Sequence, residues 1–244
     1  MIPLIARSMP SVAGTGSLCF QHLDACLPQV LTARIVLLSA PAGAGKTVAL
    51  RRWAELLGAQ GRRAAWLTLG DAIADLPELF AAIAQSIARA VPGWQHPEPL
   101  AADDRTDPEA AAAALSNAWL ATGEPVALIL DGLEHATPAA TALVRQLVDG
   151  LPANGQLLVA SRVLPDLGLS RLRLFGGLVE IGLAQLRFGP DEIRLLLGGR
   201  LSADQQGALM RATDGWAAGI GLASRTLDGG ADAESMLRAV SGRA

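Results

Sequence analysis

Five short stretches of nearly continuous apolar residues recur along the chain. They lie at residues 34–40, 64–69, 126–131, 156–161 and 178–183. Apolar runs of this length are typical of strands that are buried on both faces of a mostly parallel sheet. The pattern therefore predicts a five-stranded, mostly parallel sheet.

Helical segments separate these runs, and several carry recognisable start signals. The stretch Thr47–Gln60 has a helical pattern and is followed by glycine, a common helix stop. Asp107-Pro108 and Thr137-Pro138 each place an N-cap residue before proline at the first helical position. Strands that alternate with helices predict an α/β three-layer domain over about residues 1–185.

After Leu183 the pattern changes to helices alone. Ser202 and Gln205 have the spacing of a capping box, and the stretches around them are apolar at helical intervals. We expect residues 186–244 to form a small helical subdomain that packs on the sheet domain. Residues 92–106, rich in proline and acidic side chains, are expected to form a surface loop.

The composition narrows the range of functions. The chain of 244 residues is 51% hydrophobic and carries a net charge of -3, with a pI of about 5.6. Because it has no basic field, we expect no direct nucleic-acid binding by this chain. The apolar runs are far shorter than the ~18 residues that a membrane span needs, and the N-terminal residues lack the pattern of a secretory signal. We expect a cytoplasmic protein with no membrane partner.

Residues 39–47 read SAPAGAGKT and nearly match the phosphate-loop pattern G-x-x-x-x-G-K-[ST]. The first glycine of that pattern is Ala40 here. Gly43 and Gly45 supply the positions where backbone N–H groups must approach a phosphate closely. Ala40 falls where the strand ends, and an extended backbone there is compatible with a side chain.

Lys46 strengthens this interpretation because it is the only lysine among the 20 lysine and arginine residues. A lysine at this position reaches the β- and γ-phosphates, and the Thr47 hydroxyl binds Mg²⁺. The alternative is a glycine-rich turn that binds nothing, but the loop follows an apolar strand and opens a helix, as the motif requires. The predicted nucleotide-binding residues of this segment are Ala42, Gly43, Ala44, Gly45, Lys46, Thr47 and Val48.

Asp131 ends the third apolar run, in VALILDGLEH. A carboxylate at the end of a neighbouring strand holds Mg²⁺ in phosphate-loop nucleotidases, although Asp-Gly is also common turn chemistry. Many hydrolysing proteins place a second acid directly after this aspartate, to orient the attacking water. That position is Gly132 here, and Glu134 is the nearest candidate for the role.

Arg162 follows the fourth apolar run, at the predicted tip of its strand. An arginine beside the phosphate loop can bind a γ-phosphate through two parallel hydrogen bonds. The alternative is an ordinary surface arginine. We therefore predict Lys46, Asp131, Glu134 and Arg162 as the catalytic set.

Several segments, in this order and spacing, resemble the N-terminal ATPase module of MalT-like, LuxR-type large regulators, which belong to the STAND class of phosphate-loop NTPases. The segments are SAPAGAGKT, AAWLTL, LILDGLEH, LLVASR, LRFGPDEIRLLL and TDGWAAGIGLA. The resemblance covers roughly residues 30–225. It implies a sheet ordered 5-1-4-3-2 and a helical subdomain that closes over the nucleotide.

The resemblance also implies roles for individual residues. Lys46 and Thr47 would bind phosphate and Mg²⁺, Asp131 would hold Mg²⁺, and Arg162 would sense the γ-phosphate. Trp216, in a segment that resembles the family's GWxAG-type sequence, would contact the nucleotide from the helical side. The chain departs from the family at Ala217, where proline is frequent, and at Asp131-Gly132, which is closer to the D-G-x-[DE] form of NACHT-type relatives.

These features together predict a signal-transduction switch that binds ATP or ADP with Mg²⁺ and hydrolyses ATP slowly. Self-association, or binding of a partner protein in the ATP state, would be the output. Two alternatives stay open, a small-molecule kinase and an interaction module that binds nucleotide without hydrolysing it. The superhelical repeats and DNA-binding domain that follow this module in the family are not expected within these residues.

Overall fold

The computed structural model describes residues 23, 26–70, 75–98 and 107–242. Its centre is a five-stranded parallel sheet in the order β2-β3-β4-β1-β5. The strands are β1 (Ile35–Ser39), β2 (Arg63–Thr68), β3 (Val126–Asp131), β4 (Gly155–Ser161) and β5 (Leu178–Ile181). This confirms the five predicted strands and, read from β5, the order 5-1-4-3-2.

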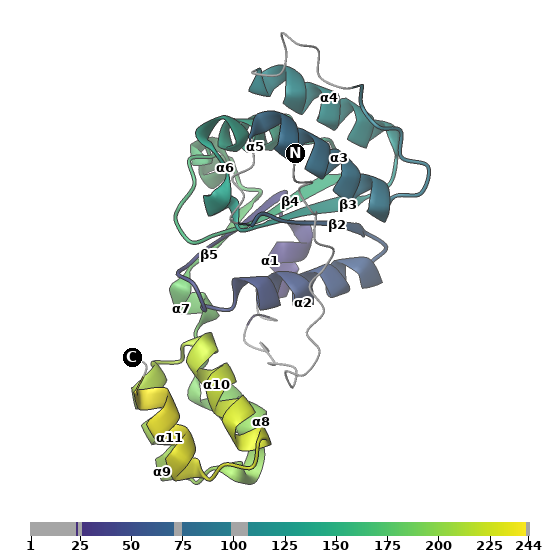
Figure 1. Ribbon diagram of the computed structural model, residues 1–244. Coiled ribbons are helices and arrows are strands. Elements are labelled where there is room, and N and C mark those ends of the chain that lie inside the picture. The colour runs from purple at the N-terminus through teal and green to yellow at the C-terminus, as the bar shows by residue number, and fades with distance from the viewer. Residues whose placement is uncertain (1–22, 24–25, 71–74, 99–106, 243–244) are drawn as a thin grey trace.

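Helices cover both faces of the sheet, which confirms the three-layer α/β architecture (Figure 1). One face carries α3 (Leu76–Ala90), α4 (Pro108–Ala121), α5 (Pro138–Asp149) and α6 (Ser170–Phe175). The other face carries α1 (Leu27–Thr32) and α2 (Lys46–Ala59).

Alternate residues of each strand enter two separate cores. Ile35 and Leu37 of β1 pack among α3, α4 and α5, whereas Val36 and Leu38 face α1 and α2. Every residue of β3 and β4 is buried. Because burial of one aliphatic side chain contributes about 1.5–3 kcal/mol, a strand that is apolar on both faces is stable only between two helical layers, as here.

The predicted helix starts are present. The Asp107 side chain accepts hydrogen bonds from the backbone N–H groups of Glu109 and Ala110, and that of Thr137 accepts one from Ala140. Ser202 and Gln205 form the expected capping box. These short-range signals fix the residues at which the helices begin.

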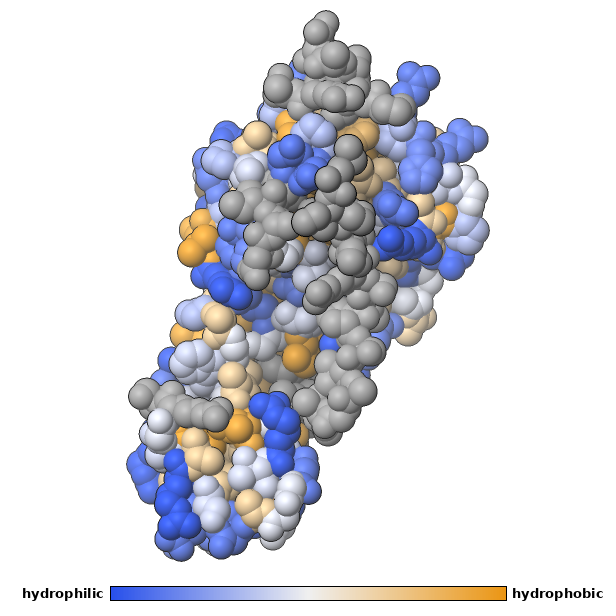
Figure 2. All heavy atoms as spheres, in the orientation of Figure 1, coloured by the Kyte–Doolittle hydropathy of each residue, from blue (hydrophilic) through white to orange (hydrophobic). Residues whose placement is uncertain are grey.

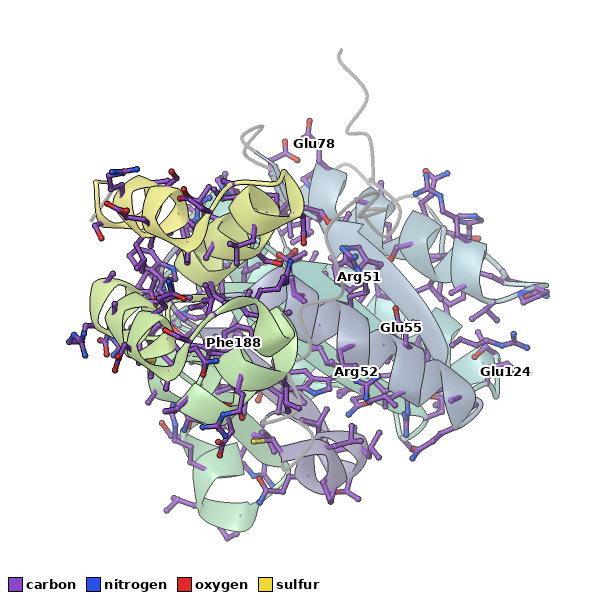
Figure 3. All side chains as sticks on the ribbon, turned by 90° about the horizontal axis from the view of Figure 1, so that it is seen from below. Arg51, Arg52, Glu55, Glu78, Glu124 and Phe188 are labelled. Carbon is purple, nitrogen blue, oxygen red and sulfur yellow. The ribbon has the colours of Figure 1, made fainter. Side chains whose placement is uncertain are left out.

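Beyond β5 the chain is helical. It forms α7 (Leu183–Leu186), α8 (Pro190–Leu197), a 3-10 turn (Gly198–Arg200), α9 (Ala203–Thr213), α10 (Ala217–Asp228) and α11 (Ala233–Ser241). The predicted boundary between residues 185 and 186 falls inside α7. Phe188, Ile220 and Met236 belong to the same core as Val36 and Leu38, so the helical part packs on the α2 side of the sheet (Figures 1 and 3).

Two expectations concern segments near the limits of the described residues. Residues 92–98 form turns and irregular backbone, as expected for a surface loop, and residues 99–106 of the same predicted loop lie outside the described residues. Within the described chain, no helix combines the length and apolar character needed to cross a membrane.

Candidate functional site

The loop between β1 and α2 has the backbone that a phosphate loop needs. Gly43 and Gly45 have φ values of 76° and 97°, a region that side chains disfavour. Among described residues other than glycine, only Asp214 has a positive φ. Ala40 therefore lies in an ordinary conformation, which explains why this position tolerates alanine.

Helix α2 begins at Lys46 with Gly45 as its N-cap, and among the described residues no side chain caps it. This distinguishes α2 from α4 and α5, whose first N–H groups are bound by Asp107 and Thr137. The first N–H groups of a helix are unpaired within it and lie at the positive end of its dipole. At α2 these groups can bind a phosphate.

The Lys46 side chain is buried above this loop. Its Nζ donates to the backbone carbonyl oxygens of Ala40, at 2.5 Å, and Pro41, at 3.0 Å. Burial lowers the pKa of the Lys46 ammonium, and Arg162 lowers it further, whereas Glu134 and Asp131 raise it. Lys46 is thus held close to the loop, in a position to meet a phosphate anion.

Asp131 lies at the carboxyl end of β3, where it is buried. Thr47 Oγ1 donates to its Oδ2 at 2.8 Å. Burial raises the pKa of the Asp131 carboxyl, partly offset by the Thr47 hydrogen bond and the Lys46 charge. A buried carboxylate beside a hydroxyl suits Mg²⁺, which prefers oxygen ligands and would compensate the buried negative charge.

Gly132 has a structural reason to be glycine. Its φ is 89°, and a Cβ at this position would lie 2.8 Å from the carbonyl oxygen of Leu69. A second acid directly after Asp131 is therefore incompatible with this backbone. A 3-10 turn (Leu133–His135) follows and brings Glu134 to the cavity instead.

Glu134 and Arg162 contact each other. Glu134 Oε1 lies 2.9 Å from Arg162 Nε, and Glu134 Oε2 accepts a hydrogen bond of 3.0 Å from the Arg162 backbone N–H. Both residues line the same cavity as Lys46 and Asp131. The structure thus brings the four predicted catalytic residues together.

This cavity has a volume of about 470 Å³ and is walled by both parts of the molecule. It is lined by Ala42, Gly43, Gly45, Lys46, Thr47, Val48, Thr68, Leu69, Asp131, Gly132, Glu134, His135, Arg162, Ala217, Ala218, Gly221 and Arg225. Ala44, predicted with its neighbours, has its side chain in the hydrophobic core, and its role in nucleotide binding stays a prediction.

Arg225 is the charged residue that sequence reasoning missed. It lies on α10, seven residues after Ala218 and four after Gly221, both of which line the cavity. This spacing places all three on one face of a helix. The helical spacing of Ala218, Gly221 and Arg225 was therefore visible in the sequence. Only the position of α10 in the fold shows that this helix face lines the cavity of the phosphate loop.

Helix α10 also contacts the phosphate loop directly. The backbone N–H of Ala218 donates to the carbonyl oxygen of Gly43 at 2.9 Å. Trp216 packs beside it, since a Cβ on Gly43 would lie 2.9 Å from Trp216 Nε1. Trp216 is 48% exposed and lines an adjoining hollow of about 340 Å³, which shares Ala218 and Arg225 with the main cavity. Its contact with nucleotide stays a prediction.

Comparison with protein families and curated proteins gives consistent results. The profile of the AAA ATPase domain family matches residues 20–160. Serine/threonine-protein kinase PknK of Mycobacterium tuberculosis (strain ATCC 25618 / H37Rv) is 32% identical over 216 residues, which cover 86% of this chain and 20% of PknK. The HTH-type transcriptional regulator MalT of Yersinia enterocolitica is 29% identical over 204 residues, covering 80% of this chain and 22% of MalT. The chain thus spans about a fifth of these curated relatives, and the predicted resemblance to MalT-like regulators is confirmed.

Solved structures agree on the fold. A STAND protein with a tetratricopeptide repeat sensor from Pyrococcus horikoshii has a TM-score of 0.57 at 14% identity, covering 81% of this chain and 28% of its own. Cdc6p from Pyrobaculum aerophilum has a TM-score of 0.54 at 18% identity, covering 93% of this chain and 65% of its own. At these identities the likeness shows the fold alone.

Proposed function

The chain belongs to the AAA ATPase domain family, and from this premise we propose that it is a nucleotide switch. It binds ATP or ADP with Mg²⁺, hydrolyses ATP slowly, and changes the placement of its helical subdomain with the nucleotide that is bound. Residues 186–244 act as that subdomain, and residues 1–185 hold the phosphates.

One observation carries the proposal, namely that the cavity wall comes from both parts of the molecule. Gly43 and Lys46 belong to the phosphate loop, whereas Ala218 and Arg225 belong to α10. The hydrogen bond between Ala218 and Gly43 joins the two directly. A nucleotide that contacts both the phosphate loop and α10 can favour one placement of the helical subdomain over another. The size of that shift is set by the difference between its affinities for the two placements.

Different residues of the cavity would bind different parts of a magnesium nucleotide. The open N–H groups of α2 and the Lys46 ammonium bind phosphate oxygens. The Thr47 hydroxyl and the Asp131 carboxylate hold Mg²⁺, which neutralises phosphate charge and orients the phosphates when bound. The guanidinium groups of Arg162 and Arg225 supply further positive charge from two sides.

Slow hydrolysis follows from the surroundings of the acids. No acid can follow Asp131 directly because Gly132 has a left-handed backbone. Both oxygens of Glu134 are already engaged by Arg162, Oε1 in an ion pair with its Nε and Oε2 in a hydrogen bond from its backbone N–H. A steady-state turnover well above ~1 s⁻¹, the low end of ordinary enzyme rates, would argue for a dedicated ATPase instead.

Calorimetric titration of the purified chain with MgATP and MgADP tests the proposal. We expect the wild type to bind both nucleotides, and Lys46→Ala to lose at least 100-fold in affinity, because a charge-assisted phosphate contact is removed from a buried site. Arg194→Ala is a matched control, because it removes an exposed cation on α8 and should bind as the wild type does. Unchanged affinity of Lys46→Ala would refute the phosphate-loop assignment.

We also propose that the ATP-bound chain self-associates through exposed apolar side chains in the segment between β4 and β5. In this segment Val163 and Leu164 follow Arg162 and are exposed, and Leu174 and Phe175 of α6 are 80% and 82% exposed. Figure 2 shows an apolar group at the left edge of the sheet domain, level with α6.

Light scattering tests this self-association. It should give a larger mass with MgATP than with MgADP, and Phe175→Glu should abolish the difference. Equal masses would exclude this output.

A further inference from the structure

The contact between Glu134 and Arg162 is more extensive than an ordinary surface ion pair. Glu134 Oε1 forms an ion pair with the Nε of Arg162, and Oε2 accepts a hydrogen bond from the Arg162 backbone N–H; His135 Nε2 also lies 3.7 Å from Oε1. The Glu134 side chain is only 13% exposed, whereas that of Arg162 is 55% exposed. The acid is therefore fixed and largely enclosed, while the arginine reaches from it into open space.

The backbone that carries Glu134 is held in place. Gly132 N–H donates to the carbonyl of Ala160, and the His135 and Ala136 N–H groups close the 3-10 turn. Leu133 is buried in the core beneath the turn. Glu134 thus projects from a rigid support between β3 and β4.

The geometry leaves one part of the arginine available. Glu134 pairs with the Nε of Arg162, and the two terminal nitrogens of Arg162 donate no hydrogen bond to any of the described residues. A guanidinium group has five N–H donors in a planar fork, and its terminal pair matches the oxygens of a phosphate. Arg162 lines the cavity together with Lys46 and Thr47.

We propose that Glu134 is a positioning residue that holds the Arg162 fork toward the terminal phosphate of a nucleoside triphosphate. The chain then discriminates ATP from ADP through this pair, because only ATP has a phosphate for the fork to bind. This inference rests on the proposed nucleotide binding. It gives Glu134 a different role from the water-orienting acid predicted from the sequence, since a water would have to share oxygens that Arg162 already occupies.

The two roles make different predictions for binding. A positioning residue acts through the arginine, so its loss weakens ATP binding and leaves ADP binding nearly unchanged. A water-orienting residue changes the rate of hydrolysis and leaves both affinities as they are. The ratio of ATP to ADP affinity is therefore the informative measurement.

The experiment is a double-mutant cycle on the full chain, with MgATP and MgADP affinities measured by calorimetry. We expect Glu134→Gln and Arg162→Ala each to lower the ATP:ADP affinity ratio about tenfold, within the range for contacting pairs. In the Arg162→Ala background, Glu134→Gln should have no further effect on the ratio. Arg162→Lys should also lose the preference, because lysine keeps the charge but lacks the fork.

Glu124→Gln is the matched control, because Glu124 also pairs with an arginine, Arg63, at 3.4 Å, and lies far from the helical subdomain in Figure 3. It should leave both affinities unchanged, and thermal melting checks that each variant is folded. An unchanged ratio in Glu134→Gln, or additive effects in the double variant, would overturn the inference while the proposed function stands. If the wild type binds neither nucleotide, the proposed function fails and the inference with it.

Discussion

At the scale of single residues, Asp131 is suited to binding Mg²⁺ but lowers the stability of the empty fold. Its carboxylate is buried at the end of β3, and burial raises its pKa above the ordinary value of 3.8. The folded chain therefore binds a proton at Asp131 more readily than the unfolded chain does. At neutral pH the ionised carboxylate destabilises the fold, a cost that bound Mg²⁺ would offset.

Asp131→Asn tests whether the Asp131 carboxylate destabilises the empty fold while it favours Mg²⁺ binding. Without nucleotide, we expect the variant to melt above the wild type at pH 8, because it removes a buried charge that destabilises the fold; each ~1 kcal/mol gained would raise the melting temperature by about 2–4 °C in a chain of this size. The amide oxygen can still accept the Thr47 hydrogen bond. The advantage should shrink as the pH falls below the raised pKa of Asp131 and disappear below 3.8, where Asp131 is protonated in both the folded and the unfolded chain.

The same variant should lose at least tenfold in affinity for MgATP, because an amide is a poorer Mg²⁺ ligand than a carboxylate. Thermal melts across pH and one calorimetric titration check both effects. A lower melting temperature at pH 8 together with unchanged nucleotide affinity would show that Asp131 is a structural residue.

The sequence predicts the position of Lys46, Asp131 and Arg162 well, for a physical reason. The ends of parallel strands lie along one edge of the sheet, so residues at those ends meet wherever the strands pair. The pairing of Glu134 with Arg162 could not be predicted this way, because it depends on the 3-10 turn after Gly132. That turn is set by the close approach of Leu69, which no local pattern reveals.

At the scale of elements, two helices begin at the cavity, α2 and α10. Gly45 and Trp216 are their N-cap residues, and neither provides a side-chain cap. Residues of both first turns line the cavity, Lys46 and Thr47 of α2 and Ala217 and Ala218 of α10. The Ala218–Gly43 hydrogen bond fixes one against the other.

Ala218→Pro should loosen this connection. Proline is tolerated in the first turn of a helix but lacks the N–H that reaches Gly43. We expect nucleotide to dissociate about two- to tenfold faster, because one hydrogen bond contributes roughly 0.5–1.5 kcal/mol. Stopped-flow displacement of a fluorescent ADP analogue measures the rate.

Ala217→Pro is the control for this change. It places proline one residue earlier, where no hydrogen bond from Ala217 to the phosphate loop is present among the described residues. Its dissociation rate should match that of the wild type. Equal rates in all three proteins would mean that α10 does not retain the nucleotide.

Element type was predictable because local signals and burial agree. The capped helices start where Asp107, Thr137 and Ser202 predict. The order of the strands was available only through the family resemblance, since all five apolar runs are similar in composition. The orientation of α10, and with it Arg225, depends on packing between distant parts of the chain, which the pattern of one helix does not contain.

At the scale of the whole molecule, the sheet domain and the helical part share one hydrophobic core. Ile220 and Met236 pack in the same cluster as Val36 and Trp53. A change in the placement of the helical part must therefore repack this shared core. Such interfaces favour a small number of discrete arrangements, which suits a switch.

The most direct test of the switch is hydrogen exchange of the amides in residues 215–228, measured with MgATP and with MgADP. The account predicts that protection of this segment differs at least threefold between the two nucleotides, whereas protection of β3 does not. Lys46→Ala should show no such difference. Equal protection of residues 215–228 in both nucleotide states of the wild type would contradict the switch.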